Sequence, residues 1–541
     1  MRFVRIALGL SFALIGLLTA IVAAVIGFFL IGPDDTVWSP EQQLKTPGTA
    51  AISAPELLNR HGPTLQVSAR QTAGDRPLFV GVARDLDVAS YLQGVRHLEI
   101  DHVQLPMHLG GVEVNTETRA VPPPTGPDWW VARGDRSLTW PIADGPYDVV
   151  VMNADGKPEV DVLVRYGVEL PGAFVITLAI GGAGLLLLAV GLVLLFRGPR
   201  QVAPAPTSDA PSSAEPVRRT EDASVRRTAG VVAMGVLVLS ATSCSAVPET
   251  DTALVLSRPA VTPEAARGEV RRYNEVFNAA ARTRDVSVLP TIEGGPLLVQ
   301  SQASFRVGKA LRKPVVPPFF YSQPLISAPD YTGYPMRFVV SSGLSSDQKV
   351  RQLGVWQREN AGSPWLVTHS VRPPAAMQLP DLTGLRVPSA ADIAIAKNAA
   401  TDLATYFTKG KASTGAFIPS PDTTQLLRRR AADIAKDRRD VYISGVTDTF
   451  RVRGEPVAFV TTTGEVLVFI AIGERYLQTI RLGEAAKWAR GDVTAFSNGK
   501  EFSRALTYDM LHQVALVVPP KGNGKARILS VDSQLTGAGG S

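Results

Sequence analysis

The stretch "VTPEAARGEVRRYNEVF", residues 261–277, decides the architecture predicted for the second half of the chain. It opens with Thr262, a good helix N-cap, followed by Pro263, which is favoured at the first helical position. Apolar side chains then recur at helical spacing, at Ala266, Val270, Tyr273 and Phe277. The stretch therefore predicts an amphipathic helix that packs its apolar face on another element.

A second copy of this pattern occurs in "SAADIAIAKNAATDLATYF", residues 389–407. Ser389 and Asp392 have the spacing of a capping box, with an acidic residue in the third position. The apolar positions of this second helix are Ile393, Ala396, Ala400, Leu403 and Phe407. Superposing Phe407 on Phe277 brings the two apolar stripes into register, which indicates an internal repeat.

The similarity continues beyond the two helices. The further matched segments are 289–298 with 418–427 and, as strand–turn–strand pairs, 353–371 with 513–533. We therefore predict two tandem α+β units, at 255–375 and 385–541. Helices followed by long antiparallel strands resemble the NTF2-like (cystatin-like) fold. That resemblance implies a curved sheet that wraps a long helix and leaves a conical cavity.

Two uncharged apolar runs in the first half of the chain are long enough to cross a membrane. They predict a cytoplasmic N-terminus with a first transmembrane helix at 1–32 and a second helix at 170–196. Arg197 and Arg200 follow the second run, and the positive-inside rule places them in the cytoplasm. Residues 33–169 are then expected to form an extracytoplasmic domain.

The only cysteine of the 541 residues, Cys244, lies in a third apolar segment. The Pro-, Ala- and Ser-rich residues 197–228 predict a disordered cytoplasmic linker before it. Residues 229–247 then predict either a third transmembrane helix or a lipoprotein signal. Small residues precede the cysteine in "ATSC", which resembles a bacterial lipobox and implies lipidation of Cys244. Both interpretations place the tandem units outside the membrane.

The predicted outer domain contains short β-rich runs separated by turn residues. These runs are 64–70, 77–83, 137–142, 147–153 and 159–168, with one helix expected at 85–92. Asp155 and Gly156 between the last two runs suggest a hairpin turn. The pattern favours an antiparallel β-sandwich. Residues 138–156, "LTWPIADGPYDVVVMNADG", resemble a segment of actinobacterial membrane proteins of unknown function, and the lipobox with its tandem domain resembles an uncharacterised actinobacterial lipoprotein.

Polar and aromatic clusters supply the candidate sites of this domain. The first cluster consists of His97, Glu99, Asp101, His102 and His108. Alternation along a strand points its members to opposite faces, so we predict solvated edge residues and no metal site. Trp129 and Trp130 follow a Pro-rich loop and are a candidate interaction loop for sugar rings or the membrane interface. The alternative is that they cover the sandwich core.

The tandem units offer His369 and His512 as bases, with Asp509 near the second, but no orienting partner at strand spacing. The net charge of +6 is small and dispersed, which argues against nucleic-acid binding. We predict a multi-pass cell-membrane protein without a cofactor or catalytic residues. Its outer domains would bind, assemble or sense, with membrane lipid and an envelope or cell-wall component as partners. The alternative is a small-ligand carrier or enzyme that uses an NTF2-like cavity.

Overall fold

The structure, a computed structural model, describes residues 2–58, 62–104, 108–196, 257–410 and 416–541. The chain is an α+β protein, as expected. It divides into two compact units. One contains the two long apolar helices, and the other contains residues 38–169 together with the C-terminal half from residue 255. The third apolar segment and Cys244 lie outside the described residues.

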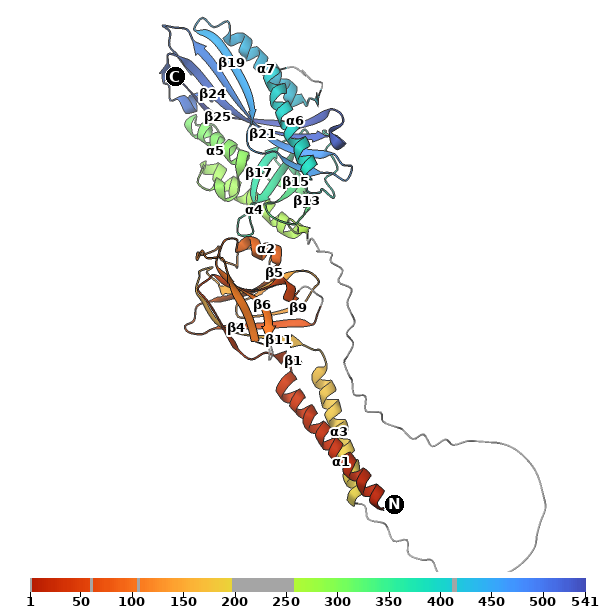
Figure 1. Ribbon diagram of the computed structural model, residues 1–541. Helices are drawn as coiled ribbons and strands as arrows, with labels where there is room; N and C mark the ends of the chain where they lie inside the picture. The colour runs from red at the N-terminus through yellow and green to blue at the C-terminus, as the bar shows by residue number, and fades with distance from the viewer. Residues whose placement is uncertain (1, 59–61, 105–107, 197–256, 411–415) are drawn as a thin grey trace, which may run out of the picture. The chain divides into compact units, whose positions relative to one another are not determined.

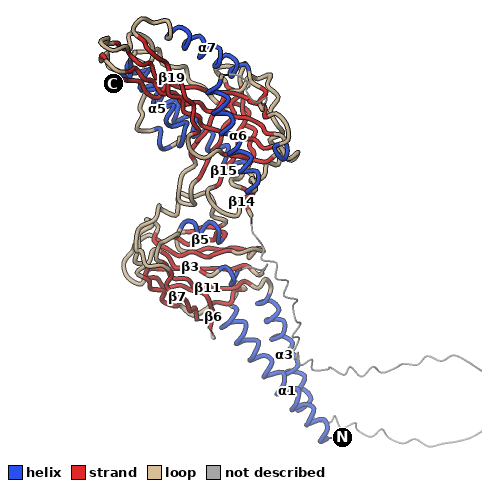
Figure 2. The backbone as a smooth tube through the Cα atoms, turned by 45° about the horizontal axis from the view of Figure 1, so that its top comes forward, coloured by secondary structure: helices blue, strands red, loops and turns tan. Residues whose placement is uncertain are grey.

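The first unit is built on α1 (Arg2–Val25), which continues as η1 (Ile26–Ile31), and on α3 (Ala173–Phe196). Both helices are long and apolar enough to cross a membrane. They lie side by side and antiparallel (Figure 2) because glycine faces glycine where they touch. A Cβ on Gly16 would lie 2.5 Å from the carbonyl oxygen of Gly184, so only glycine permits this approach.

The start of α3 is capped by Asp35, which follows the first helix in sequence. Its carboxylate accepts hydrogen bonds from the backbone N–H groups of Gly172, at 2.9 Å, and Phe174, at 2.7 Å. These hydrogen bonds lower the pKa of Asp35 and satisfy donors that a helix N-terminus leaves free. The cap therefore links the two helices at one end of the pair.

Residues 38–169 form two sheets and short helices. The elements are β1 (Thr36–Trp38), β2 (Gln42–Thr46), β3 (Ala50–Ser53), η2 (Pro55–Leu58), β4 (Thr64–Gln71), β5 (Leu78–Arg84), α2 (Asp85–Tyr91), β6 (His97–Gln104), β7 (His108–Val114), β8 (Ala132–Gly134), β9 (Ser137–Pro141), β10 (Tyr147–Asn153) and β11 (Val160–Glu169). In one sheet β11 pairs with β2 and β4, and β4 pairs with β9. The other has the order β7-β6-β3-β10-β5-β8. A shared core that includes Val67, Val80 and Val162 packs the sheets face to face.

The hairpin expected at Asp155 and Gly156 is wrong. The turn is present, since the N–H of Gly156 donates to the carbonyl oxygen of Asn153 at 3.0 Å. However, β10 pairs with β3 and β5, whereas β11 pairs with β2 and β4. The turn therefore passes the chain from one sheet to the other. Turn chemistry signals a reversal of the chain but does not fix which strands pair.

The two-sheet domain contacts the C-terminal half through buried polar groups. Asp87 of α2 is 1% exposed and accepts a charge-assisted hydrogen bond from Arg258 at 2.5 Å and one from the Tyr334 hydroxyl at 2.8 Å. Trp129 donates its indole N–H to the carbonyl oxygen of Ala361 at 2.9 Å. These hydrogen bonds offset the cost of burying the polar groups, although Oδ2 of Asp87 has no partner.

The C-terminal half contains two segments with a similar order of elements. The first comprises β12 (Arg258–Pro259), α4 (Pro263–Thr283), η3 (Leu289–Thr291), α5 (Gly295–Ala310), β13 (Tyr321–Ser327), β14 (Asp330–Tyr331), β15 (Met336–Leu344), β16 (Arg351–Arg358) and β17 (Leu366–Val371). The second comprises α6 (Ala390–Lys409), β18 (Phe417–Ile418), α7 (Pro421–Asp437), β19 (Ile443–Val452), β20 (Val457–Val460), β21 (Val466–Ile480), β22 (Ala486–Lys487), α8 (Thr494–Ser497), β23 (Glu501–Phe502), β24 (Ala505–Val518), η4 (Pro520–Gly522) and β25 (Ala526–Gly540).

Both predicted helix starts are confirmed. Thr262 caps α4, and Ser389 with Asp392 forms a capping box on α6. The predicted apolar stripes are buried or partly buried with one exception, Ile393, which is 41% exposed. This residue lies in the first turn of α6, before the helix reaches the sheet, so the stripe was predicted one turn too long.

Each segment contains an antiparallel sheet and helices that pack on it. The first sheet has the order β13-β15-β16-β17, and the second contains β25-β24-β21-β19. Helices α6 and α7 lie on one face of the second sheet (Figure 1). The opposite faces of the two sheets share an apolar cluster between them, which includes Val339, Val355, Phe469 and Val517. The two segments therefore pack sheet against sheet, and α5 of the first segment also contacts β17, β24 and β25.

Candidate functional site

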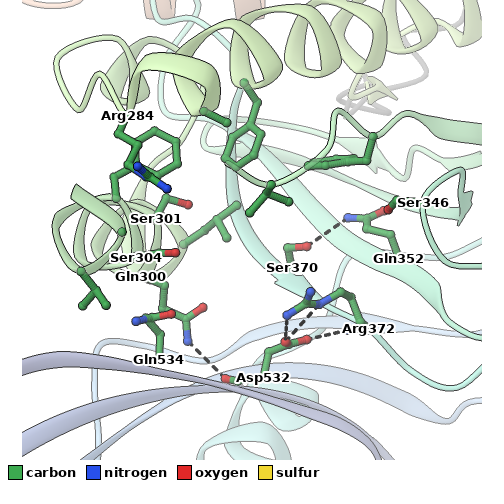
Figure 3. Close-up of a pocket in the computed structure, with 18 of the residues that line it drawn as sticks. Arg284, Gln300, Ser301, Ser304, Ser346, Gln352, Ser370, Arg372, Asp532 and Gln534 are labelled. Atoms are coloured by element: carbon green, nitrogen blue, oxygen red, sulfur yellow. Dashed lines mark hydrogen bonds and ion pairs between the residues drawn. The ribbon is translucent and has the colours of Figure 1, made fainter. Parts of the chain in front are cut away.

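A cavity of about 400 Å³ lies where the two α+β segments meet. Its walls come from α4 and α5, from the first sheet and from β25 of the second segment (Figure 3). This volume is within the range typical of small-molecule sites. The cavity is the candidate site because it combines an apolar wall with a group of converging polar side chains.

The apolar wall is aromatic. It is formed by Tyr273, Phe277, Phe305, Phe319 and Tyr321. The rings of Tyr273 and Tyr321 stack with a centroid separation of 5.6 Å, and Phe277 lies 5.3 Å from Phe319. Aromatic side chains packed on one another hold a flat surface in place, which suits an apolar or ring-containing ligand.

The polar wall consists of amides, hydroxyls and one ion pair (Figure 3). Arg372 follows β17 and contacts Asp532 of β25 at 2.5 Å, and its backbone N–H donates to the same carboxylate at 2.8 Å. The Asp532 carboxylate raises the pKa of Arg372, which stays charged. This pair joins the two segments across the cavity.

Gln300 of α5 holds the same joint. Its amide donates to the carbonyl oxygens of Leu511 at 2.7 Å and Asp532 at 3.2 Å, and its own oxygen accepts from Gln513 at 2.6 Å. With donor and acceptor groups both used and the side chain buried, this contact is rigid. The position of α5 against β25 is thereby fixed.

Arg284 supplies a further positive charge at the cavity. It ends α4 in a left-handed conformation and donates to the carbonyl oxygens of Lys313 and Pro314. In the described part of the chain, these contacts join its guanidinium to backbone carbonyls and not to a carboxylate. Its charge is therefore available to an anionic group, and Ser301 lies beside it in Figure 3.

Glu293 lies behind the cavity wall and is 1% exposed. Its Oε1 atom accepts a hydrogen bond from the hydroxyl of Tyr273 at 2.8 Å. Burial raises the pKa of Glu293 to about 7, while hydrogen bonds from Ser301 and Tyr273 lower it. Burial and the nearby Glu293 raise the pKa of Tyr273 well above its usual value. Because Tyr273 and Ser301 both line the cavity, the charge on Glu293 is coupled to its wall.

The two candidate histidines differ in their surroundings. His369 is buried, and desolvation lowers its pKa to about 3, so its ring is neutral. His512 is also buried, but it is hydrogen-bonded to Glu474 at 2.8 Å and to Ser533 at 2.7 Å. The expected neighbour Asp509 instead lies 3.6 Å from Arg475.

The other predicted site residues do not gather at the cavity. Trp129 is buried and Trp130 is half-buried, so the pair packs within the chain and does not form an exposed loop. His102 is hydrogen-bonded to Asp101 at 2.5 Å on the exposed part of β6, whereas His97 is buried. Within the described residues, no group of three or more His, Cys, Asp or Glu side chains could hold a metal ion.

Sequence reasoning missed the cavity and the partners of His512. Glu474, His512 and Ser533 come from three strands, and Gln300 meets residues more than 200 positions away. The predicted strand–turn–strand at 513–533 was the one sequence signal that concerned the partners of His512. This prediction implies that the start and the end of the segment lie side by side, where His512 and Ser533 meet.

These features define a protein with two long apolar helices, a two-sheet domain and a double α+β module that has a cavity at its joint. A family model described as "Domain of unknown function (DUF8094)" matches residues 257–540, more than half of the chain, so the chain belongs to this family. Neither the curated proteins nor the solved structures contain a match.

Proposed function

We propose that this protein is a membrane-anchored cell-envelope protein whose C-terminal module binds a small amphipathic molecule. The observation that carries the proposal is the cavity of about 400 Å³ with an aromatic wall opposite a polar one. Binding of this kind needs no chemical step, which agrees with the prediction of a non-enzymatic protein. The proposal also includes the alternative function from the sequence, a small-ligand carrier that uses an NTF2-like cavity.

The membrane part of the proposal rests on α1 and α3, which are long and apolar enough to span a bilayer. Arg5 before the first apolar run and Arg197 after the second favour cytoplasmic ends for both helices. The two-sheet domain and the tandem module would then be extracytoplasmic. Lipidation at Cys244 would anchor the module separately. Membrane lipid is the proposed partner of the helices, and an envelope protein or cell-wall polymer that of the outer surface.

We further propose that both α+β units are NTF2-like. In the first unit, Trp356 and Phe338 stack between α4 and the sheet and fill the inner part of the space that the fold would leave open. Phe469 of the second unit lies instead between the two sheets. What remains open in the first unit is the end next to β25, where the cavity is found.

The walls indicate the chemistry of the ligand. Five aromatic rings favour an apolar or ring-containing body, and burial of such a body supplies most of the binding free energy. Arg284 favours a carboxylate or another anionic group at one end, because a guanidinium donates charge-assisted hydrogen bonds to anions. We therefore propose an amphipathic organic anion.

A fluorescent aliphatic carboxylate, added to the full-length protein in detergent, tests the proposal. The variant Ser304→Trp places a large ring at the cavity, where Ser304 is exposed, and should abolish saturable binding. The control Val299→Trp changes an exposed position of the same helix that does not line the cavity, and should bind normally. Equal binding by both variants would refute the assignment of the cavity as the site.

A further inference from the structure

An exposed loop of prolines and valines borders the cavity. Residues 314–318, here called the rim loop, have the sequence "PVVPP" and lie between α5 and β13. All five residues are exposed, Val315 by 47% and Val316 by 68%. Pro314 and Val316 also line the cavity. The rim loop therefore forms part of the mouth of the cavity and exposes apolar side chains to solvent there.

Hydrogen bonds at both ends hold the rim loop in place. At its start, the guanidinium of Arg284 donates to the carbonyl oxygens of Lys313 and Pro314. At its end, the side-chain amide of Asn278 donates to the carbonyl oxygen of Phe319 at 2.7 Å, and the Asn278 oxygen accepts from the N–H of Phe319 at 3.1 Å. Both anchors come from α4 and the residue that ends it, so the loop has a fixed place beside the cavity.

The composition of the rim loop suits contact with an apolar phase. Three of its five residues are prolines, which have no backbone N–H. An N–H group without a hydrogen-bond partner is costly in an apolar environment, and only Val315 and Val316 would bring one. Prolines also restrict the backbone before any contact is made, so little conformational entropy is lost on docking.

Basic side chains border the rim loop. They are Arg284, Lys309, Arg312 and Lys313, and two carboxylates, Asp285 and Asp492, lie among them. Lys313 is paired with Asp492 at 2.7 Å. Within the described part of the chain, neither Arg284 nor Arg312 forms an ion pair with a carboxylate. Two cationic groups beside an apolar loop favour a surface that presents anionic groups next to apolar carbon.

We propose that the rim loop docks on a lipid bilayer and that the cavity takes up its ligand directly from the lipid phase. This inference rests on the proposed binding function and names the source of the ligand. A single-chain lipid acid has an apolar chain and an anionic head, which match the aromatic wall and Arg284. Its chain dissolves poorly in water, so a direct path from the bilayer to the cavity avoids hydrating the chain.

The rest of the chain favours a bilayer as the occupant of this surface. The described residues include two helices, α1 and α3, that are long and apolar enough to cross a membrane. A partner protein that covered the rim loop would also cover the mouth of the cavity, because Pro314 and Val316 belong to both. A bilayer instead brings to the mouth the phase in which an amphipathic ligand dissolves.

Uptake of the fluorescent aliphatic carboxylate from vesicles tests the inference. The full-length protein is held in phosphatidylcholine nanodiscs, and the donor vesicles contain phosphatidylcholine and phosphatidylglycerol in equal parts. Uptake by Ser304→Trp in the same nanodiscs gives the background. If docking lies on the path, the rate of uptake should rise in proportion to the vesicle concentration. A rate that does not depend on vesicle concentration would show transfer through water and overturn the inference.

Two matched variants test the rim loop itself. Val315 does not line the cavity, and Val299 of α5 is an equally exposed valine, at 46%, that does not line it either. Val315→Asn should slow uptake from vesicles at least 5-fold and leave the affinity for the carboxylate in detergent unchanged. Val299→Asn should match the wild type in both measurements. Val315→Trp should speed uptake, because an indole ring favours the membrane interface. Equal uptake by Val315→Asn and Val299→Asn would refute the role of the loop.

A dye whose emission depends on polarity measures docking without the ligand. Attached to Val315→Cys in a Cys244→Ala background, it should shift its emission to shorter wavelength when vesicles are added, whereas the same dye on Val299→Cys should not. If the carboxylate binds in detergent but the dye at residue 315 does not respond, the binding function stands and docking is refuted. If the dye responds but the carboxylate does not bind, the proposed binding function fails and the docking surface stands.

Discussion

Glu293 behind the cavity wall should make the first α+β segment less stable as the pH rises. Its folded-state pKa of about 7 is above the ordinary value of 4.5. The folded state therefore holds the proton more tightly than the unfolded state. The stability that this proton gives is complete below about pH 4.5 and is lost as the pH rises towards 7. Replacement by Gln keeps an acceptor for Tyr273 but removes the titration.

The size of the effect follows from the shift in pKa. A shift of about 2.5 pH units corresponds to roughly 3 kcal/mol at full ionisation, at about 1.4 kcal/mol per unit. Between pH 5 and pH 8 the wild type should lose about 2.5 kcal/mol relative to Glu293→Gln, since part of the loss has already occurred at pH 5. A difference of this size is a large fraction of the stability of a domain.

Hydrogen exchange of the α4 peptides measures this difference locally, which avoids assuming that a multidomain chain unfolds in one step. After correction for intrinsic exchange, the free energy of opening should fall from pH 5 to pH 8 in the wild type more than in Glu293→Gln. The control Glu275→Gln removes an exposed carboxylate from the same helix and should follow the wild type. Parallel pH profiles for the wild type and Glu293→Gln would refute the reasoning.

Three further predictions concern the rest of the chain. Gly16→Leu should separate α1 from α3, because a Cβ at residue 16 meets the backbone of α3 at 2.4 Å, and the stability of the helix pair in detergent should therefore fall. Gly182→Leu, where a Cβ meets no atom within 4 Å, should have no effect. Asp87→Ala should lower the free energy of unfolding by about 3–5 kcal/mol, because it leaves the buried Arg258 unpaired. Asp75→Ala, whose carboxylate is 90% exposed, should lower it by less than about 1 kcal/mol, and thermal unfolding measures both. If the lipobox is used, a blot should show two fragments in the wild type and one uncut chain in Cys244→Ala; identical patterns would contradict cleavage.

Local signals in the sequence predicted local structure well. Thr262 and Ser389 marked helix starts because capping depends on side chains within one turn. The runs around 64–70 and 147–153 became strands for a similar reason, since alternation reports the environment of each face. The turn at Gly156 shows the limit of such local signals, because which strands pair after a turn depends on strands elsewhere in the chain.

The hydrogen-bonded partners of His512 could not be predicted because they depend on register. Glu474 and Ser533 are 38 and 21 positions from His512, and only the alignment of β21, β24 and β25 brings them together. A shift of one residue in either pair would turn a partner to the opposite face. Asp509, close in sequence to His512, was the natural candidate from spacing alone, but it is half-buried and lies 3.6 Å from Arg475.

The tandem arrangement follows from strands that are apolar on both faces. Along 466–472 every residue is apolar and buried; Val468 packs towards α6, and Phe469 packs towards the sheet of the other unit. Such a run is typical of a strand covered on both sides. One unit alone would expose the second face as a large apolar patch, which soluble domains avoid. The units are therefore expected to be stable only as a pair. The cavity needs the same pairing, because Asp532 of one unit and Arg372 of the other both form its wall.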